Sequence, residues 1–119
     1  MTTGQPRTRA FAQALDLRDE HGVVEAYLTH HRHVWPQVVA SLRSCGVHRM
    51  RIFLLGHRLF MYFEAAEDFD PARDYQAYAA DPACARWDAL MRELQTPAPG
   101  DAPGDWWKQM TEVFDLEAQ

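Results

Sequence analysis

The chain has 119 residues, a length that suits one domain of ordinary size. Hydrophobic residues make up 47% of it and charged residues 24%, so it can bury a core and need not be disordered. A formal net charge of -5 argues against a nucleic-acid partner, because binding to phosphates usually needs a basic patch.

The first residues, MTTGQPRTRA, are polar and lack the apolar segment of a secretory signal. We expect a short disordered leader at 1–9 and a single domain over 10–119. The sequence contains no run of about 18 apolar residues, so we expect no transmembrane helix. Cys45 and Cys84 lie in no C-x-x-C motif; a disulfide is possible, and two buried thiols are favoured. We therefore expect a soluble, cytoplasmic protein that does not bind membranes.

The first expected elements are a strand and a helix. Residues 10–17, AFAQALDL, favour a strand, although their alanines would also suit a helix. Val23, Tyr27 and His31 then follow at four-residue spacing, which is typical of one helix face. A strand followed by a helix is therefore predicted.

Pro36 divides the helical region that follows. Its ring clashes with the preceding turn, so the first helix should end between His31 and His33. Proline is favoured at the first position of a helix, so a second helix should begin at Pro36. Gly46 stands where a glycine commonly ends a helix.

A strand hairpin is expected next. Residues 47–55, VHRMRIFLL, alternate polar and apolar side chains, and 59–64, LFMYFE, form a second strand. The intervening residues GHR, 56–58, offer a glycine for a turn that needs a positive φ.

The last part of the chain alternates helices, a loop and a strand. Residues 71–82 and 84–95 indicate two helices separated at Asp81-Pro82. Residues 96–104, TPAPGDAPG, are a loop by composition. Residues 105–116 are interpreted as a final strand.

The element order is β-α-α-β-β-α-α-β, which predicts an α+β protein with the ferredoxin-like βαββαβ pattern and an antiparallel sheet. Helices would cover one face of that sheet. The other face would pack against a second copy or hold a cleft. The side chains available for either use are Met50, Ile52, Phe60, Tyr62 and Trp107.

The stretch YLTHHRHVWP, residues 27–36, concentrates histidines and aromatic residues. Tyr27 and His31 are four residues apart, so they share one helix face and could form an acid–base pair. The alternative is that Tyr27 is core and His31 is a surface residue.

Three histidines in this stretch also raise the question of a metal site. His31 and His33 diverge by 200° on a helix, and Glu25 is the nearest carboxylate in sequence. We therefore predict no metal ion. Which of His30, His31 and His33 faces inward is left open.

Tryptophan is abundant for a small chain, with four residues. Core packing is the expected role for at least two of them, and an indole could also stack on the apolar face of a sugar. Such a site would also need polar residues that bind hydroxyls, and Asp88, Arg86 and Gln109 are candidates by their proximity in sequence. The chain lacks a P-loop, a Rossmann glycine fingerprint and a G-x-S-x-G motif, so covalent catalysis and phosphate-bearing cofactors are unsupported.

The segment YLTHHRHVWPQVVASLRSCGV resembles the L-rhamnose mutarotase family, with the pattern Tyr-x3-His-x3-Trp-Pro and a glycine before a strand. The matching residues are Tyr27, His31, Trp35, Pro36 and Gly46. The resemblance continues through RIFLLGHRLFMYFE, DPACARWDALM and EVFDL, over about residues 10–116. It implies a small α+β barrel, dimeric through its sheets, that interconverts the α and β anomers of a 6-deoxy sugar without a cofactor.

The resemblance also implies roles for particular residues. Tyr27 matches an active-site tyrosine, His31 the acid–base histidine and Trp87 the first of a tryptophan pair that lines the sugar pocket. Met50 stands in place of a second active-site tyrosine, and Asp88 in place of the second tryptophan.

Both replacements depart from the rhamnose pattern. Met50 is similar to the L-fucose mutarotase branch, as is the Pro-Gly-rich loop that leads to Gly104, Asp105, Trp106 and Trp107. We expect a monosaccharide substrate, L-fucose over L-rhamnose, and a homodimer. The expected substrate-binding residues are Trp87, Met50, Asp88, Trp35 and Trp107.

Two other functions fit the same architecture. A small monooxygenase or haem-degrading enzyme could use His31 as an axial ligand. A non-catalytic sugar-binding module would bind a sugar without changing the rate of anomer exchange. The fold alone does not distinguish a mutarotase from these two alternatives, so the preference for a mutarotase depends on the sequence motif.

Overall fold

A computed structural model describes residues 8–100 and 106–119. Three long antiparallel strands form the centre of its sheet: β1 (Thr8–Leu17), β2 (Val47–Leu55) and β3 (Arg58–Ala66). The strand order is β2-β3-β1, so the hairpin of β2 and β3 lies beside the first strand. This is the antiparallel ferredoxin-like sheet that the element order predicts.

Two short strands complete the sheet on the outer edge of β1. They are β4 (Gln95–Thr96) and β5 (Lys108–Gln109), and both pair antiparallel with β1. Pro97 follows β4 directly and has no amide N–H to donate, so the strand cannot extend in that direction. The fourth strand of the pattern is therefore divided into two pieces.

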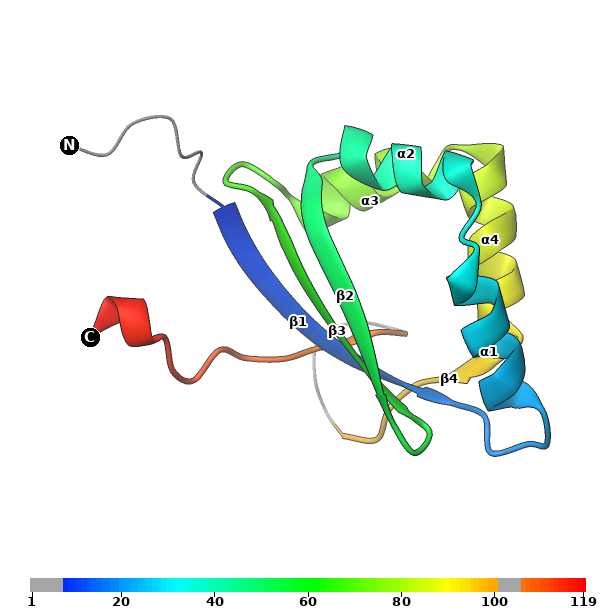
Figure 1. Ribbon diagram of the computed structural model, residues 1–119. Coiled ribbons are helices and arrows are strands. Elements are labelled where there is room, and N and C mark those ends of the chain that lie inside the picture. Colours follow the sequence, from blue (N-terminus) through cyan, green and yellow to red (C-terminus); the bar gives the residue numbers. More distant parts are fainter. Residues whose placement is uncertain (1–7, 101–105) are drawn as a thin grey trace.

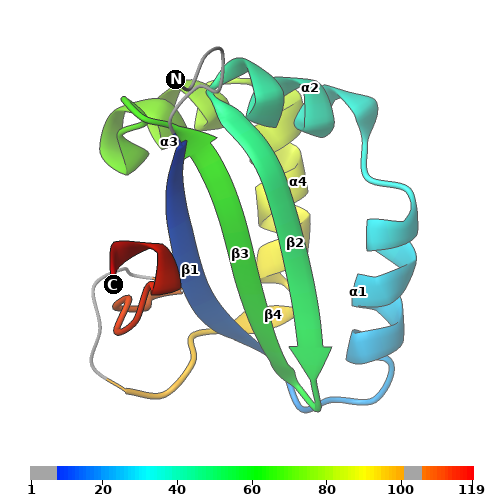
Figure 2. The ribbon, with the colours of Figure 1, turned by 60° about the vertical axis from the view of Figure 1, so that its left-hand side comes forward.

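Four helices cover one face of the sheet: α1 (Val23–Arg32), α2 (Pro36–Ser44), α3 (Pro71–Ala79) and α4 (Pro82–Arg92). Figure 1 shows them on one side of the strands, and Figure 2 shows the bare face of the sheet in front of them. Among the residues described, no helix is long and apolar enough to cross a membrane.

The boundaries of the helices follow the chemistry of the chain. Trp35 has an extended backbone, with φ −56° and ψ 132°, and Pro36 begins α2 as predicted. Gly46 takes a φ of 106° directly after that helix, which a residue with a side chain rarely adopts. Asp81 caps α4 by accepting hydrogen bonds from the amides of Ala83 and Cys84.

The alternation of side chains gives the sheet two unlike faces. Leu15, Leu59 and Phe63 point toward the helices and are almost fully buried. Arg49 and Phe53 point away from the helices, and Phe53 is 46% exposed. The core therefore fills the space between the sheet and the helices.

Several expectations need correction. The final strand predicted at 105–116 is wrong in extent, because pairing stops after the Met110 amide donates to the Ala12 carbonyl. Residues 111–119 leave the sheet and end in a 3-10 turn, η1 (Leu116–Ala118). Their polar and apolar residues do not meet a second strand to pair with, so pattern alone overestimated the length.

Smaller differences concern the hairpin, the last helix and the N-terminus. The hairpin turn contains only Gly56 and His57, because Arg58 already pairs with Leu55. Helix α4 starts at Pro82 and ends at Arg92, whereas the prediction ran from 84 to 95. Thr8 and Arg9 of the expected leader belong to β1, and residues 1–7 lie outside the described residues, as do 101–105 of the expected loop and strand. The two cysteine thiols are free.

Candidate active site

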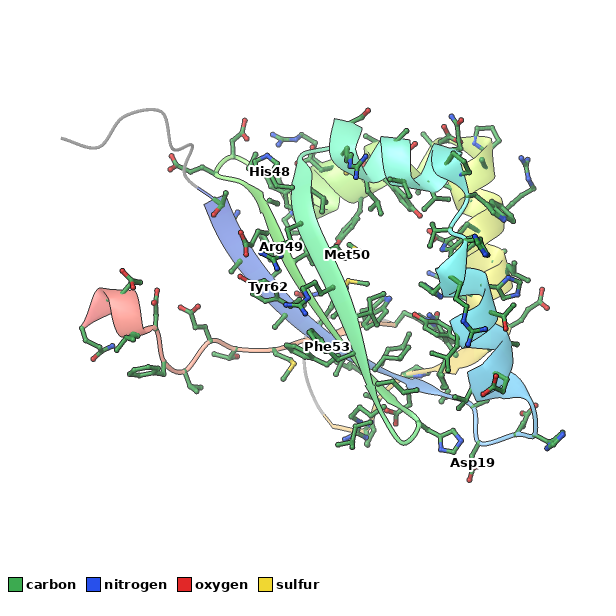
Figure 3. The ribbon with its side chains drawn as sticks, in the orientation of Figure 1. Asp19, His48, Arg49, Met50, Phe53 and Tyr62 are labelled. Atoms are coloured by element: carbon green, nitrogen blue, oxygen red, sulfur yellow. The ribbon has the colours of Figure 1, made fainter. Side chains whose placement is uncertain are left out.

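A cavity of about 490 Å³ lies between the sheet and the helices. Its volume falls in the range of small-molecule pockets, about 300–1,000 Å³. Met50 and Ile52 of β2 line it from the sheet side. Figure 3 shows Met50 directed toward the helices, whereas Arg49 and Tyr62 lie on the open side of the sheet. Polar and aromatic side chains from α1, α3 and α4 and the aliphatic side chains of Val38 and Leu42 from α2 complete the wall.

Tyr27 and His31 form one stacked pair on the wall that α1 provides. Their ring centroids lie 4.1 Å apart with an interplanar angle of 26°. Tyr27 is only 3% exposed, and both residues line the cavity. The four-residue spacing predicted that they share a helix face, and they do. Of the three histidines, His31 is the one that lines the cavity.

The hydrogen bond of His31 defines its tautomer. Nδ1 lies 3.0 Å from the backbone oxygen of Tyr27, and a carbonyl oxygen can only accept. Nδ1 therefore carries the proton, which leaves a lone pair on Nε2 in the neutral ring. Burial lowers the pKa of His31, so the ring is neutral near pH 7 and can act as a base.

The phenol of Tyr27 stays protonated. Burial raises the pKa of Tyr27 to about 12, although a side-chain hydrogen bond with Gln95 acts in the opposite direction. A neutral phenol beside a neutral imidazole gives the α1 wall one fixed donor and one base.

Trp87 links the two helices that line this part of the cavity. Its indole packs edge-on against His31 at 5.4 Å and against Trp35 at 5.3 Å between ring centroids. His30 approaches the same indole at 6.2 Å. Trp87 is 5% exposed and lines the cavity, whereas Trp35 packs behind it. The imidazole of His31 is thereby held on one side by Tyr27 and on the other by Trp87.

No group of three or more His, Cys, Asp or Glu side chains within residues 8–100 and 106–119 could hold a metal ion. His33 ends α1 and is exposed, and the three histidines of the stretch do not converge.

Asp88 lies on the cavity wall that α4 provides. Its Oδ1 accepts a hydrogen bond of 3.2 Å from the hydroxyl of Tyr78, and both residues line the cavity. Burial raises the pKa of the Asp88 carboxyl, while the Tyr78 hydroxyl and the charge of Arg92 act to lower it.

Gln13 and Gln95, both buried, form a part of the site that sequence reasoning missed, whereas Gln109 was a candidate by its position in the sequence. Arg86, another such candidate, is not on the cavity wall. Gln95 accepts a hydrogen bond of 2.8 Å from the indole N–H of Trp106. Gln13 accepts one of 2.5 Å from the amide of Gln109. All four line the cavity. The one available signal was Gln13, a polar residue on the face of β1 that otherwise carries Phe11 and Leu15.

A second hollow adjoins the cavity beside β2. It has a volume of about 400 Å³ and lies between that strand and the first two helices. It shares five lining residues with the cavity, namely His31, Val34, Leu42, Met50 and Ile52. His31 therefore lies where the two hollows meet.

Six of the seven predicted site residues meet on the cavity wall, and Trp35 does not. The six are Tyr27, His31, Met50, Trp87, Asp88 and Trp107. Chemically, the cavity combines indole faces, a neutral base, a phenol donor, a carboxylate and carboxamides. This set suits a small polyhydroxylated molecule with an apolar face.

Comparison with known proteins gives a family match over nearly the whole chain. A family model described as L-rhamnose mutarotase matches residues 10–116. An L-fucose mutarotase of Xanthomonas campestris is 41% identical over 104 residues, which is 86% of this chain and 83% of that protein. An L-rhamnose mutarotase of Klebsiella pneumoniae is 30% identical over 77% of this chain and 85% of its own.

A solved structure of L-rhamnose mutarotase from Formosa agariphila has the same fold. It superposes with a TM-score of 0.66 at 20% identity, over 91% of this chain and 98% of that one.

Proposed function

Because this chain belongs to the L-rhamnose mutarotase family, and is accordingly an isomerase, we propose that it interconverts the α and β anomers of L-fucose, and less effectively of L-rhamnose, by cofactor-free acid–base ring opening. The observation that carries the proposal is the geometry of His31. Its Nδ1 is bound to a backbone carbonyl, and the ring lines both the cavity and the hollow beside β2.

The residues of α1 support a proton-transfer mechanism. Nε2 of His31 takes the proton of the anomeric hydroxyl, the bond between C1 and the ring oxygen breaks, and the imidazolium gives that proton to the ring oxygen. The open aldehyde rotates about C1–C2, and the same steps in reverse close the ring on its other face. Tyr27, which keeps its proton, donates a hydrogen bond to a sugar oxygen and holds the imidazole by stacking.

Apolar contacts suit a substrate that must rotate during turnover. We assign the apolar face of the sugar to the indoles of Trp87 and Trp107, which line the cavity together with Met50. The thioether of Met50 is unbranched and adapts its shape, so it can accompany a moving 6-deoxy methyl group.

Two observations support L-fucose over L-rhamnose. The chain is 41% identical to the L-fucose mutarotase of Xanthomonas campestris and 30% identical to the L-rhamnose mutarotase of Klebsiella pneumoniae. Met50 and Asp88, the two residues that depart from the rhamnose pattern, both line the cavity.

The test is saturation-transfer proton NMR on the anomeric protons of each sugar with catalytic amounts of the protein. We expect faster exchange for both sugars and a larger acceleration for L-fucose. A larger acceleration for L-rhamnose would reverse the preference. Absence of acceleration for either sugar would contradict the proposed reaction.

We also propose that two copies pair through the bare faces of their sheets. The C-terminal segment 111–119 is exposed throughout and extends on the open side of the sheet, away from the helices (Figure 1). Three of its apolar side chains are among the most exposed of the chain, namely Val113 at 93%, Phe114 at 64% and Leu116 at 71%. Apolar surface of this kind favours a protein partner.

Charge favours a second copy as that partner. The segment carries Glu112, Asp115 and Glu117, whereas the open sheet face presents Arg49 and Arg51. A two-fold pair would place the acidic segment of each copy near these two arginines of the other. We expect light scattering to give a dimer mass, and Phe114→Asp to weaken the dimer while Ala77→Asp on the exposed side of α3 does not. A monomeric parent chain would contradict this arrangement.

A further inference from the structure

Helix α4 presents a second polar pair to the cavity, separate from the histidine and tyrosine of α1. Asp88 and Arg92 are four residues apart, so they share one face of the helix, and both line the cavity. The guanidinium carbon of Arg92 lies 5.4 Å from the ring centroid of Trp106. The proposed proton transfer uses neither residue.

The carboxylate of Asp88 is held by one oxygen only. Oδ1 accepts the hydrogen bond from the Tyr78 hydroxyl. Among residues 8–100 and 106–119, no donor is bound to Oδ2. An ionised carboxylate has about four acceptor positions. The side chain therefore has fixed orientation and remaining capacity to accept hydrogen bonds.

Sugar hydroxyls can both donate and accept. A carboxylate that only accepts and a guanidinium that only donates, one helical turn apart, match two hydroxyl groups of one ring. The indole of Trp106, which packs against the guanidinium of Arg92, adds an apolar surface beside this polar pair.

We propose that Asp88 and Arg92 bind hydroxyl groups of the sugar ring as an acceptor and a donor, and that this hydroxyl grip holds the sugar with similar strength before and during ring opening. The inference rests on the proposed function and adds the residues that recognise the hydroxyls. Tyr78 is then a positioning residue, because its hydroxyl donates its hydrogen bond to the carboxylate.

The first experiment measures anomer exchange of L-fucose at several sugar concentrations for the parent and for Asp88→Asn. Hydrogen bonds to a charged group contribute about 1.5–3 kcal/mol, so KM should rise about tenfold to a hundredfold. The value of kcat should change by less than about threefold, since uniform binding is lost rather than transition-state stabilisation. Glu93→Gln, the next carboxylate along the chain and exposed, is the control and should leave both unchanged.

The pH dependence of KM distinguishes a substrate-binding role of Asp88 from a purely structural one. The groups that act on Asp88 are Tyr75 and Tyr78 from α3 and Arg92 from α4. Protonation removes the negative charge of Asp88, so KM of the parent should rise as the pH falls through the pKa of this residue. Asp88→Asn should lack that rise.

The outcomes separate the two proposals. Acceleration by the parent together with an unchanged KM in folded Asp88→Asn overturns the assignment of the hydroxyl grip alone. No acceleration by the parent overturns the mutarotase proposal, and the grip with it. If Asp88→Asn does not fold, Tyr78→Phe replaces it, with an expected rise in KM of about threefold and an unchanged kcat; no rise would overturn the assignment.

Discussion

The walls that α1 and α4 contribute to the cavity are built differently. Tyr27 and His31 are stacked, and the histidine is bound to the backbone of its own helix. Asp88 depends on a hydroxyl from α3 for its orientation. The hydrogen bond that orients His31 therefore forms within a single helix, whereas the one that orients Asp88 requires the packing of two.

The difference between the walls corresponds to their proposed roles, which are proton transfer for the α1 wall and substrate binding for the α4 wall. A base must meet a proton within hydrogen-bond distance, so a rigid local arrangement favours catalysis. A hydroxyl grip tolerates small displacements, so it can rely on contacts between helices. We expect changes on the α1 wall to lower kcat and changes on the α4 wall to raise KM.

We expect the largest effect from a change of Trp87, because this residue lies on α4 and touches His31 on α1. Trp87→Ala should lower the free energy of unfolding by about 3–5 kcal/mol, because the indole is buried between two helices. It should also lower kcat and raise KM together. Urea denaturation and anomer-exchange kinetics measure the two effects.

The control for this variant is Trp35→Phe, which keeps an aromatic ring behind Trp87. We expect a loss of less than about 1.5 kcal/mol and near-parental kinetics. A change in KM alone for Trp87→Ala would contradict the idea that this indole couples the walls.

The two walls also differ in how far sequence could predict them. The pair Tyr27 and His31 depends on four-residue spacing along one helix, and Pro36 and Gly46 mark the second helix by backbone chemistry, so these features were predictable. Asp88 was placed in the site by its position next to Trp87 in the sequence and by family resemblance. Its partner Tyr78 is ten residues away on another helix, and that pairing is a product of tertiary packing.

The remaining errors have the same cause. Gln95 was expected near the end of a helix, yet it forms a two-residue strand beside β1 and turns its amide into the cavity. The final strand was overestimated because periodicity does not reveal whether a neighbouring strand is present to accept hydrogen bonds. Trp35 fits the motif well, but α2 begins directly after it and the ring packs behind Trp87.

A pH titration tests whether His31 on the α1 wall acts as a neutral base. Burial lowers the pKa of His31 below its usual value of about 6.5. The base is active when unprotonated, so kcat/KM should fall as the pH drops through this lowered pKa, with a midpoint below about 6.5. Proton NMR of the histidine rings, with His31→Ala for assignment, measures the pKa directly. A midpoint above 6.5 would contradict a buried, neutral base.

The same shift has a consequence for stability. Below about pH 6.5 the unfolded chain binds a proton at this residue that the folded chain resists. The free energy of unfolding should therefore fall as the pH decreases from 7 toward the folded-state pKa. His31→Ala should lose this part of the pH dependence relative to the parent.

The smallest expected effect concerns the carboxamides beside the two walls. Trp106→Phe removes the N–H that binds Gln95 and should lower the free energy of unfolding by about 0.5–1.5 kcal/mol. We expect kcat to change by less than about threefold, because Gln95 keeps its contact with Tyr27. A loss of kcat as large as that of a base variant would place Gln95 among the residues of the reaction itself.

The most direct test of the proposed reaction compares the parent with His31→Ala by saturation transfer between the anomeric protons of L-fucose. His33→Ala is the matched control, because His33 is exposed and lies two residues further along the same segment. We predict that His31→Ala loses about 10²- to 10⁴-fold of the acceleration while His33→Ala retains it. Equal acceleration by the parent and a folded His31→Ala would contradict the assignment of His31 as the base.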